Sequence, residues 1–234
     1  MEYPVLILHG WDSSSKNWSR VKELLEDKGY KVIVPDLPGF GENSTPPEPW
    51  LIDDYVEWVK DFCEKNNLSQ IFLLGHSFGG STAIKFALKY PDAIKKLFLI
   101  ASSGIRKKTF RKELLRKISN FFSKFSFLPF YDLIRKIAYR TLFRRSDYLL
   151  TEGVMKETYL NVIREDISDS FSNISVPALL VWGEKDKITP LQHAYFMKEK
   201  IAGAKLEIIP NVKHNPHFEA PEILAEKILN FIEL

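Results

Sequence analysis

The 234-residue sequence contains a single cysteine, Cys63, so no internal disulfide can form. This excludes the small disulfide-stabilised proteins, and a lone thiol within an apolar helical pattern predicts a buried side chain and a cytoplasmic location. No segment approaches the roughly 18 consecutive apolar residues of a membrane span. The short apolar run at the N-terminus lacks the basic flank of a signal peptide. We therefore expect no stable membrane insertion.

Acidic residues are scarce in the middle of the chain. Residues 106–166 contain fifteen Lys and Arg against seven Asp and Glu, a net charge of +8, whereas the whole chain carries +3. This contrast indicates a separate structural unit. Its basic surface has three interpretations: a solvated helical face, a surface that steers anionic substrates, or a contact for a membrane surface or partner. No nucleic-acid-binding module is recognisable, so we expect no nucleic acid as partner.

Short apolar runs rich in β-branched residues alternate with amphipathic stretches of helical length. The runs predict buried strands of a parallel sheet. The alternation predicts the α/β fold class, a doubly wound sheet with helices on both faces. The expected strands are residues 4–8, 31–35, 70–74, 96–101, 177–182 and 205–209, and the expected helices are residues 18–28, 51–66, 78–90, 191–200 and 221–231.

The alternation is interrupted once, between residues 102 and 175. Apolar residues there recur at helical spacing, which predicts an all-helical insertion that covers the strand ends as a cap. We therefore divide the chain into an α/β core, residues 1–104 and 172–234, and a helical cap, residues 105–171. Cap aromatics such as Phe121 and Phe125 are suited to an acyl pocket, but helical spacing favours simple packing. No cap residue is assigned to a site.

A candidate nucleophile lies at the end of the third expected strand. The sequence Gly75-His76-Ser77-Phe78-Gly79 follows an apolar run and opens a helical stretch. This is the strand, sharp turn and helix context of a G-x-S-x-G nucleophile elbow, in which the serine is strained and exposed. Gly75 and Gly79 are expected where a β-carbon would clash. Ser77 is the predicted nucleophile.

A serine hydroxyl needs a neighbouring base to take its proton, and the chain has five histidines. His214 follows the last expected strand, in the loop before the final helix, and is the favoured base. His217 is the alternative, although its place beside Pro216 favours a structural role. His193 is expected to face solvent on its helix.

The base in turn needs a carboxylate that holds its tautomer. Asp186 directly follows the fifth expected strand and is the predicted acid. Asp36 and Glu184 are the rivals. Asp36 precedes a glycine-rich turn, where a short carboxylate accepts backbone N–H bonds, and Glu184 is expected to face solvent.

A tetrahedral oxyanion requires preorganised N–H donors. We expect one to be the backbone amide of Phe78, directly after the nucleophile. The other is expected to be the amide of Trp11, in the turn after the first strand. Because both donors are backbone groups, the side chains at these positions are free to vary.

The assembled motifs resemble those of the cap-bearing α/β-hydrolases, a group that includes BioH-type carboxylesterases, lactonases and meta-cleavage-product hydrolases. The resemblance implies the α/β-hydrolase fold, the chain order Ser, Asp, His of its catalytic triad, and chemistry without a cofactor or metal. The sequence departs from the family at its start, since the usual N-terminal antiparallel hairpin is missing. We therefore expect six parallel strands, one less protected sheet edge, and a monomer or homodimer. The matching motifs are His9-Gly10-Trp11, residues 34–41, residues 75–80, residues 176–186 and His214 with residues 219–222.

The leading hypothesis is hydrolysis of small carboxylic esters or lactones through a serine acyl-enzyme. Hydrolysis of a carbon–carbon bond in a vinylogous diketone is the alternative within the enzyme class, because the same triad supports it. The rival class is a non-catalytic protein that binds a small ligand on the same scaffold.

Overall fold

A single parallel sheet forms the centre of the computed structural model, which describes residues 3–106 and 152–234. Within these residues the sheet has six strands in the order β2-β1-β3-β4-β5-β6, and every pairing is parallel. The predicted fold class is therefore confirmed. The strands are β1 (Val5–Leu8), β2 (Val32–Ile33), β3 (Ile71–His76), β4 (Ile94–Ile100), β5 (Ala178–Gly183) and β6 (Lys205–Ile209).

The strand order reverses direction between β1 and β3. From β1 the chain passes to β2 at one edge and then returns to β3 on the other side of β1. At such a switch point the two connections leave in opposite directions, so a crevice opens beyond the carboxyl ends of the strands. The register aligns Leu8 with Gly75, which brings the residues that follow β1 and β3 to the same place. A ligand site is expected there.

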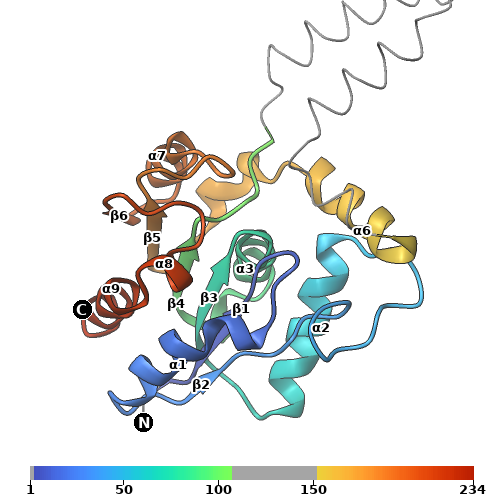
Figure 1. The fold of residues 1–234 in the computed structure, drawn as a ribbon, viewed down its shortest axis with the longest axis horizontal. Coiled ribbons are helices and arrows are strands. Elements are labelled where there is room, and N and C mark those ends of the chain that lie inside the picture. Colours follow the sequence, from blue (N-terminus) through green and yellow to red (C-terminus); the bar gives the residue numbers. More distant parts are fainter. Residues whose placement is uncertain (1–2, 107–151) are drawn as a thin grey trace, which may run out of the picture.

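Helices cover both faces of the sheet (Figure 1). One core contains side chains of α1 and α9, and the other contains side chains of α2, α3, α6 and α7. Parallel strands buried on both faces carry nearly continuous apolar runs, which is the pattern that the sequence presents. The helices are α1 (Ser19–Glu26), α2 (Ile52–Lys65), α3 (Phe78–Lys89), α6 (Gly153–Arg164), α7 (Leu191–Lys200), α8 (Pro216–Glu219) and α9 (Pro221–Ile232), with short 3₁₀ turns η1 (Ser15–Trp18), η2 (Pro91–Ala93) and η5 (Ser168–Asn173).

Side chains of β3 alternate between the two cores. Ile71 and Leu73 belong to the core under α2 and α3, and Phe72 and Leu74 belong to the core under α1 and α9. The two-residue period of a strand continues this pattern to its end, so His76 lies on the α1 and α9 face. The last residue of the strand, His76, is thus directed to that face, and Ser77 follows it in the turn before α3.

Three expectations differ from the structure or lie beyond it. The prediction that His193 faces solvent is wrong: its side chain is buried, because α7 packs against η5 and against β5 and β6. The second strand is shorter than residues 31–35, since Pro35 has no N–H for the ladder. The helix α6 lies inside the expected cap, but residues 107–151, with Phe121 and Phe125, lie outside the described residues. The cap boundaries stay a prediction.

Within residues 3–106 and 152–234, no helix has both the length and the apolar character needed to cross a membrane.

Candidate active site

Ser77 lies in a strained turn between β3 and α3. Its backbone has φ 50° and ψ −114°, a conformation that a non-glycine residue adopts only when its surroundings enforce it. The surroundings are tight: a β-carbon on Gly75 would lie 2.4 Å from the carbonyl oxygen of Gly79, and one on Gly79 would lie 2.2 Å from that of Leu8. The two glycines therefore have the role that the sequence predicts, and the elbow holds the serine out of the sheet.

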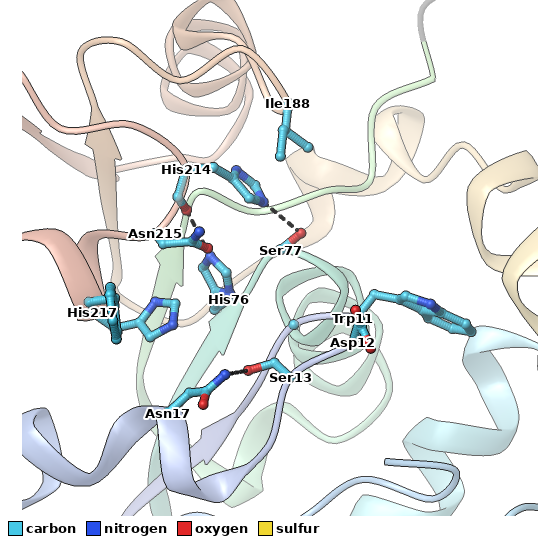
Figure 2. Close-up of a pocket in the computed structure, with 12 residues that line it drawn as sticks. Trp11, Asp12, Ser13, Asn17, His76, Ser77, Ile188, His214, Asn215 and His217 are labelled. Carbon is cyan, nitrogen blue, oxygen red and sulfur yellow. Dashed lines mark hydrogen bonds between the residues drawn. The ribbon is translucent and has the colours of Figure 1, made fainter. Parts of the chain in front are cut away.

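The structure brings Ser77, His214 and Asp186 together beyond the strand ends. Figure 2 shows the ring of His214 directed at the hydroxyl of Ser77. The Oγ of Ser77 lies 3.0 Å from Nε2 of His214, and Nδ1 of His214 lies 2.8 Å from Oδ2 of Asp186. Since a carboxylate accepts, Nδ1 carries the proton and the lone pair of Nε2 faces the serine. The arrangement can take a proton from the Ser77 hydroxyl.

Asp186 is only 6% exposed, and its carboxylate is nevertheless fully supplied with donors. Oδ1 accepts the backbone N–H groups of Ile188 and Thr189 at 2.8 and 3.0 Å. Oδ2 lies 2.8 Å from the hydroxyl oxygen of Thr189, which is also 3.0 Å from the carbonyl oxygen of Ala101, and the single hydroxyl proton is donated to one of these two acceptors at a time. Sequence reasoning missed Thr189, although an Asp followed three residues later by Thr is typical of a side-chain-capped turn.

We expect Thr189→Val to destabilise the protein by about 1.5–3 kcal/mol, because a buried charged group loses a hydrogen bond while the side-chain volume is kept. Thr189→Ser keeps the hydroxyl and serves as the matched control, with a smaller loss. Urea unfolding of both variants measures the difference. Equal free energies of unfolding for the Val and Ser variants would mean that the hydroxyl contributes nothing.

The two backbone amides proposed for an oxyanion lie at the switch point. Phe78 is the first residue of α3, where N–H groups have no partner within the helix and the helix dipole favours negative charge. Trp11 follows β1 and lines the same cavity as Ser77. The rings of Trp11 and Phe78 are in contact, with centroids 5.4 Å apart. Their assignment as the two donors stays a prediction.

A cavity of about 310 Å³ opens at Ser77 (Figure 2). Polar side chains of Ser13, Asn17 and Asn215 form one part of its lining. Ile188 and Phe218 line it as well, and they are 69% and 76% exposed. A small organic molecule with polar and apolar parts fits a space of this size and lining.

The chain matches the model of a known protein family. A family model described as alpha/beta hydrolase fold matches residues 3–146 and 111–221. The chain belongs to this family. At the family level, this alpha/beta hydrolase is of the esterase and lipase type.

Named relatives of the hydrolase carry out more than one reaction. Lipase 1 of Psychrobacter immobilis is 26% identical, over 97% of this chain and 76% of its own. The 2-hydroxy-6-oxo-6-phenylhexa-2,4-dienoate hydrolase of Burkholderia cepacia is 23% identical, over 97% of this chain and 87% of its own. A thermophilic esterase of Thermogutta terrifontis, solved with malate bound, is 25% identical with a TM-score of 0.75, covering 100% of this chain and 90% of its own.

The two carboxylates considered as alternatives to Asp186 form hydrogen bonds with other groups of the hydrolase. Asp36 accepts the backbone N–H of Glu42 at 2.8 Å, next to the turn for which the sequence predicts such bonds, and that of Ser15 at 2.6 Å, which ties in a second loop. Burial raises the pKa of Asp36, but these N–H bonds outweigh it and the net pKa is lowered. Glu184 is exposed and accepts the N–H of Asn211 at 2.9 Å.

Buried imidazoles surround the His214 loop. Burial, with help from the neighbouring rings, lowers the pKa of His76 well below its ordinary value and that of His217 to about 4. His9 has its pKa lowered by burial too, and its Nε2 accepts the N–H of Leu37 at 2.9 Å. His217 is therefore neutral near pH 7, and it stacks on the ring of Trp18 at 4.4 Å.

These buried histidines predict a loss of stability in mild acid. An unfolded histidine binds a proton near pH 6.5, whereas the folded hydrolase holds His76 and His217 neutral to lower pH, so the unfolded state takes up more protons. The stabilisation is fully present above about pH 6.5 and falls toward pH 4, by up to about 1.4 kcal/mol per pH unit for each group. Urea unfolding at pH 7, 6 and 5 measures the slope. His217→Phe, which keeps a stacking ring, should make it shallower, and an unchanged slope would contradict the assignment.

Proposed function

We propose that this hydrolase cleaves small carboxylic esters or lactones through an acyl-enzyme on Ser77. The observation that supports it is the unbroken line of hydrogen bonds from the Ser77 hydroxyl through both ring nitrogens of His214 to the buried carboxylate of Asp186. A serine in this setting gains a base at 3.0 Å, and the base gains an orienting carboxylate at 2.8 Å. No cofactor is needed for this chemistry.

The proposed reaction has two halves. The Ser77 oxygen attacks the ester carbonyl carbon while its proton passes to Nε2 of His214, and Asp186 stabilises the resulting imidazolium. The negative oxygen of the tetrahedral intermediate accepts the N–H groups of Trp11 and Phe78. When the intermediate collapses, His214 returns the proton to the leaving alcohol oxygen, and the acyl group stays on Ser77. Water then attacks the acyl carbon while His214 takes its proton. The bond between the acyl carbon and Ser77 Oγ breaks, His214 returns the proton to Oγ, and the acid is released.

Two observations favour an ester or lactone bond in a small substrate: the volume of the cavity and the names of the relatives. A cavity of about 310 Å³ suits a short acyl or alkyl group. Ester hydrolysis is also the reaction named for two of the relatives, a lipase and an esterase. Carbon–carbon bond hydrolysis is the second candidate, and the dienoate hydrolase of Burkholderia cepacia supports it. A small-molecule partner, a monomer or homodimer, and a cytoplasmic location stay predictions.

A fluorophosphonate probe and a substrate panel test the proposal. The probe should label the protein once, on the peptide that contains Ser77, because only an activated serine reacts with it. Among p-nitrophenyl esters of increasing acyl length, kcat/KM should be highest for the shorter chains. A faster reaction with a 2-hydroxy-6-oxodienoate than with any ester would favour the carbon–carbon alternative. If the probe does not label the protein and no substrate is turned over, the non-catalytic ligand-binding class is favoured.

A further inference from the structure

His76, the residue before the nucleophile, is tied to the loop that carries the base. Its Nε2 lies 2.9 Å from the main-chain carbonyl oxygen of His214, 138 residues away in sequence. A carbonyl oxygen only accepts, so Nε2 of His76 carries the proton and donates it. The hydrogen bond therefore joins the end of β3 to the loop between β6 and α8.

The ring of His76 is held in one orientation by its neighbours. It is 3% exposed, and the ring of His217 packs against it at 4.6 Å with an angle of 62°. His217 in turn lies flat on Trp18, with 7° between the ring planes. On another side is Gly10, where a β-carbon would lie 2.8 Å from Nδ1 of His76. A ring so enclosed cannot swing away from the carbonyl without displacing its neighbours.

We propose that His76 is a positioning residue, whose Nε2–H fixes the main chain of His214 so that the His214 ring reaches Ser77 and Asp186 together. The catalytic consequence rests on the proposed function. Because His76 and Ser77 are consecutive, the residue that anchors the base and the nucleophile itself belong to one rigid turn. A shift of this turn therefore moves His214 along with Ser77.

The neutral state of His76 suits this role. Burial holds the pKa of His76 well below its ordinary value, and the nearby rings of His217 and His214 lower it further. The His76 and His214 ring centroids are 5.1 Å apart. A charged His76 would repel the imidazolium that forms on His214 during proton transfer. A neutral donor fixes the loop without opposing that charge.

Two variants of similar length separate positioning from packing. His76→Gln retains an N–H donor near the position of Nε2, whereas His76→Met fills the space without a donor. Loss of the anchor lets the His214 ring drift, and small misplacements of a reacting group lower rates by roughly 10- to 100-fold. We expect kcat of the His76→Met variant to fall by this factor while its KM stays nearly unchanged. The kcat of the His76→Gln variant should lie within a few-fold of the wild-type value. Equal kcat in the two variants, with equal thermal stability, would overturn the proposal.

A second measurement does not depend on turnover. The proton on Nδ1 of His214 gives a low-field NMR resonance when it is held against Asp186, and His214→Asn assigns it by its loss. The resonance should be present in wild type and Gln and broadened or absent in Met. If it behaves this way in a protein without hydrolytic activity, the positioning role stands and the proposed function fails. A resonance equally sharp in Met, or missing from wild type, contradicts the anchor.

Discussion

Ser77→Ala is expected to lower kcat for a short p-nitrophenyl ester by roughly 10⁴- to 10⁶-fold, and His214→Ala by about as much. In the proposed mechanism the hydroxyl and its base act as one unit, because Oγ of Ser77 and Nε2 of His214 lie 3.0 Å apart and the acyl-enzyme forms only when both are present. The double variant should therefore be hardly slower than either single one. The remaining rate above that in water comes from binding and from N–H groups facing the oxyanion.

Burst titration and steady-state kinetics measure these losses, with circular dichroism to verify folding. Ser69→Ala is the matched control, since Ser69 is an exposed serine just before the opposite end of β3 and should leave the rate unchanged. An active Ser77→Ala protein would remove the nucleophile assignment. Strictly multiplicative losses in the double variant would mean that Ser77 and His214 work independently.

Local sequence signals predict most of the core of this protein. Each strand is a short apolar run, and each connection has a helical period, so both element types can be read within a window of about ten residues. The elbow around Ser77 is equally local, because its glycines and serine occupy consecutive positions. The loop positions of Asp186 and His214 follow from the rule that chemistry gathers at the carboxyl ends of parallel strands.

Long-range packing explains what the sequence does not reveal. The contact of His76 with the His214 carbonyl spans 138 residues, and no spacing pattern indicates it. The burial of His193 depends on how α7 packs against η5 and the sheet edge, which its own helix period does not contain. Thr189 is intermediate: its turn is local, but its contact with Ala101 joins the segments that follow β4 and β5.

Asp186→Asn should lower kcat of the folded protein by roughly 10³- to 10⁴-fold, because an amide changes the tautomer of the base. The Asn oxygen would still accept the N–H groups of Ile188 and Thr189, which leaves its NH₂ facing His214. Nδ1 of His214 would then accept rather than donate. Its proton would move to Nε2, and the Ser77 hydroxyl would face a donor instead of a lone pair.

Asp36→Asn is the matched comparison, since both carboxylates are held by backbone N–H groups and only one touches a histidine of the proposed triad. It should cost about 1.5–3 kcal/mol of stability, because charge-assisted bonds to two loops are weakened. The kcat of the folded variant should fall no more than a few-fold. Urea unfolding gives the free energy of unfolding of each variant, and ester kinetics gives its kcat. A crossed result, with kcat lost in Asp36→Asn and kept in Asp186→Asn, would show that the acid of the triad has been assigned to the wrong strand end.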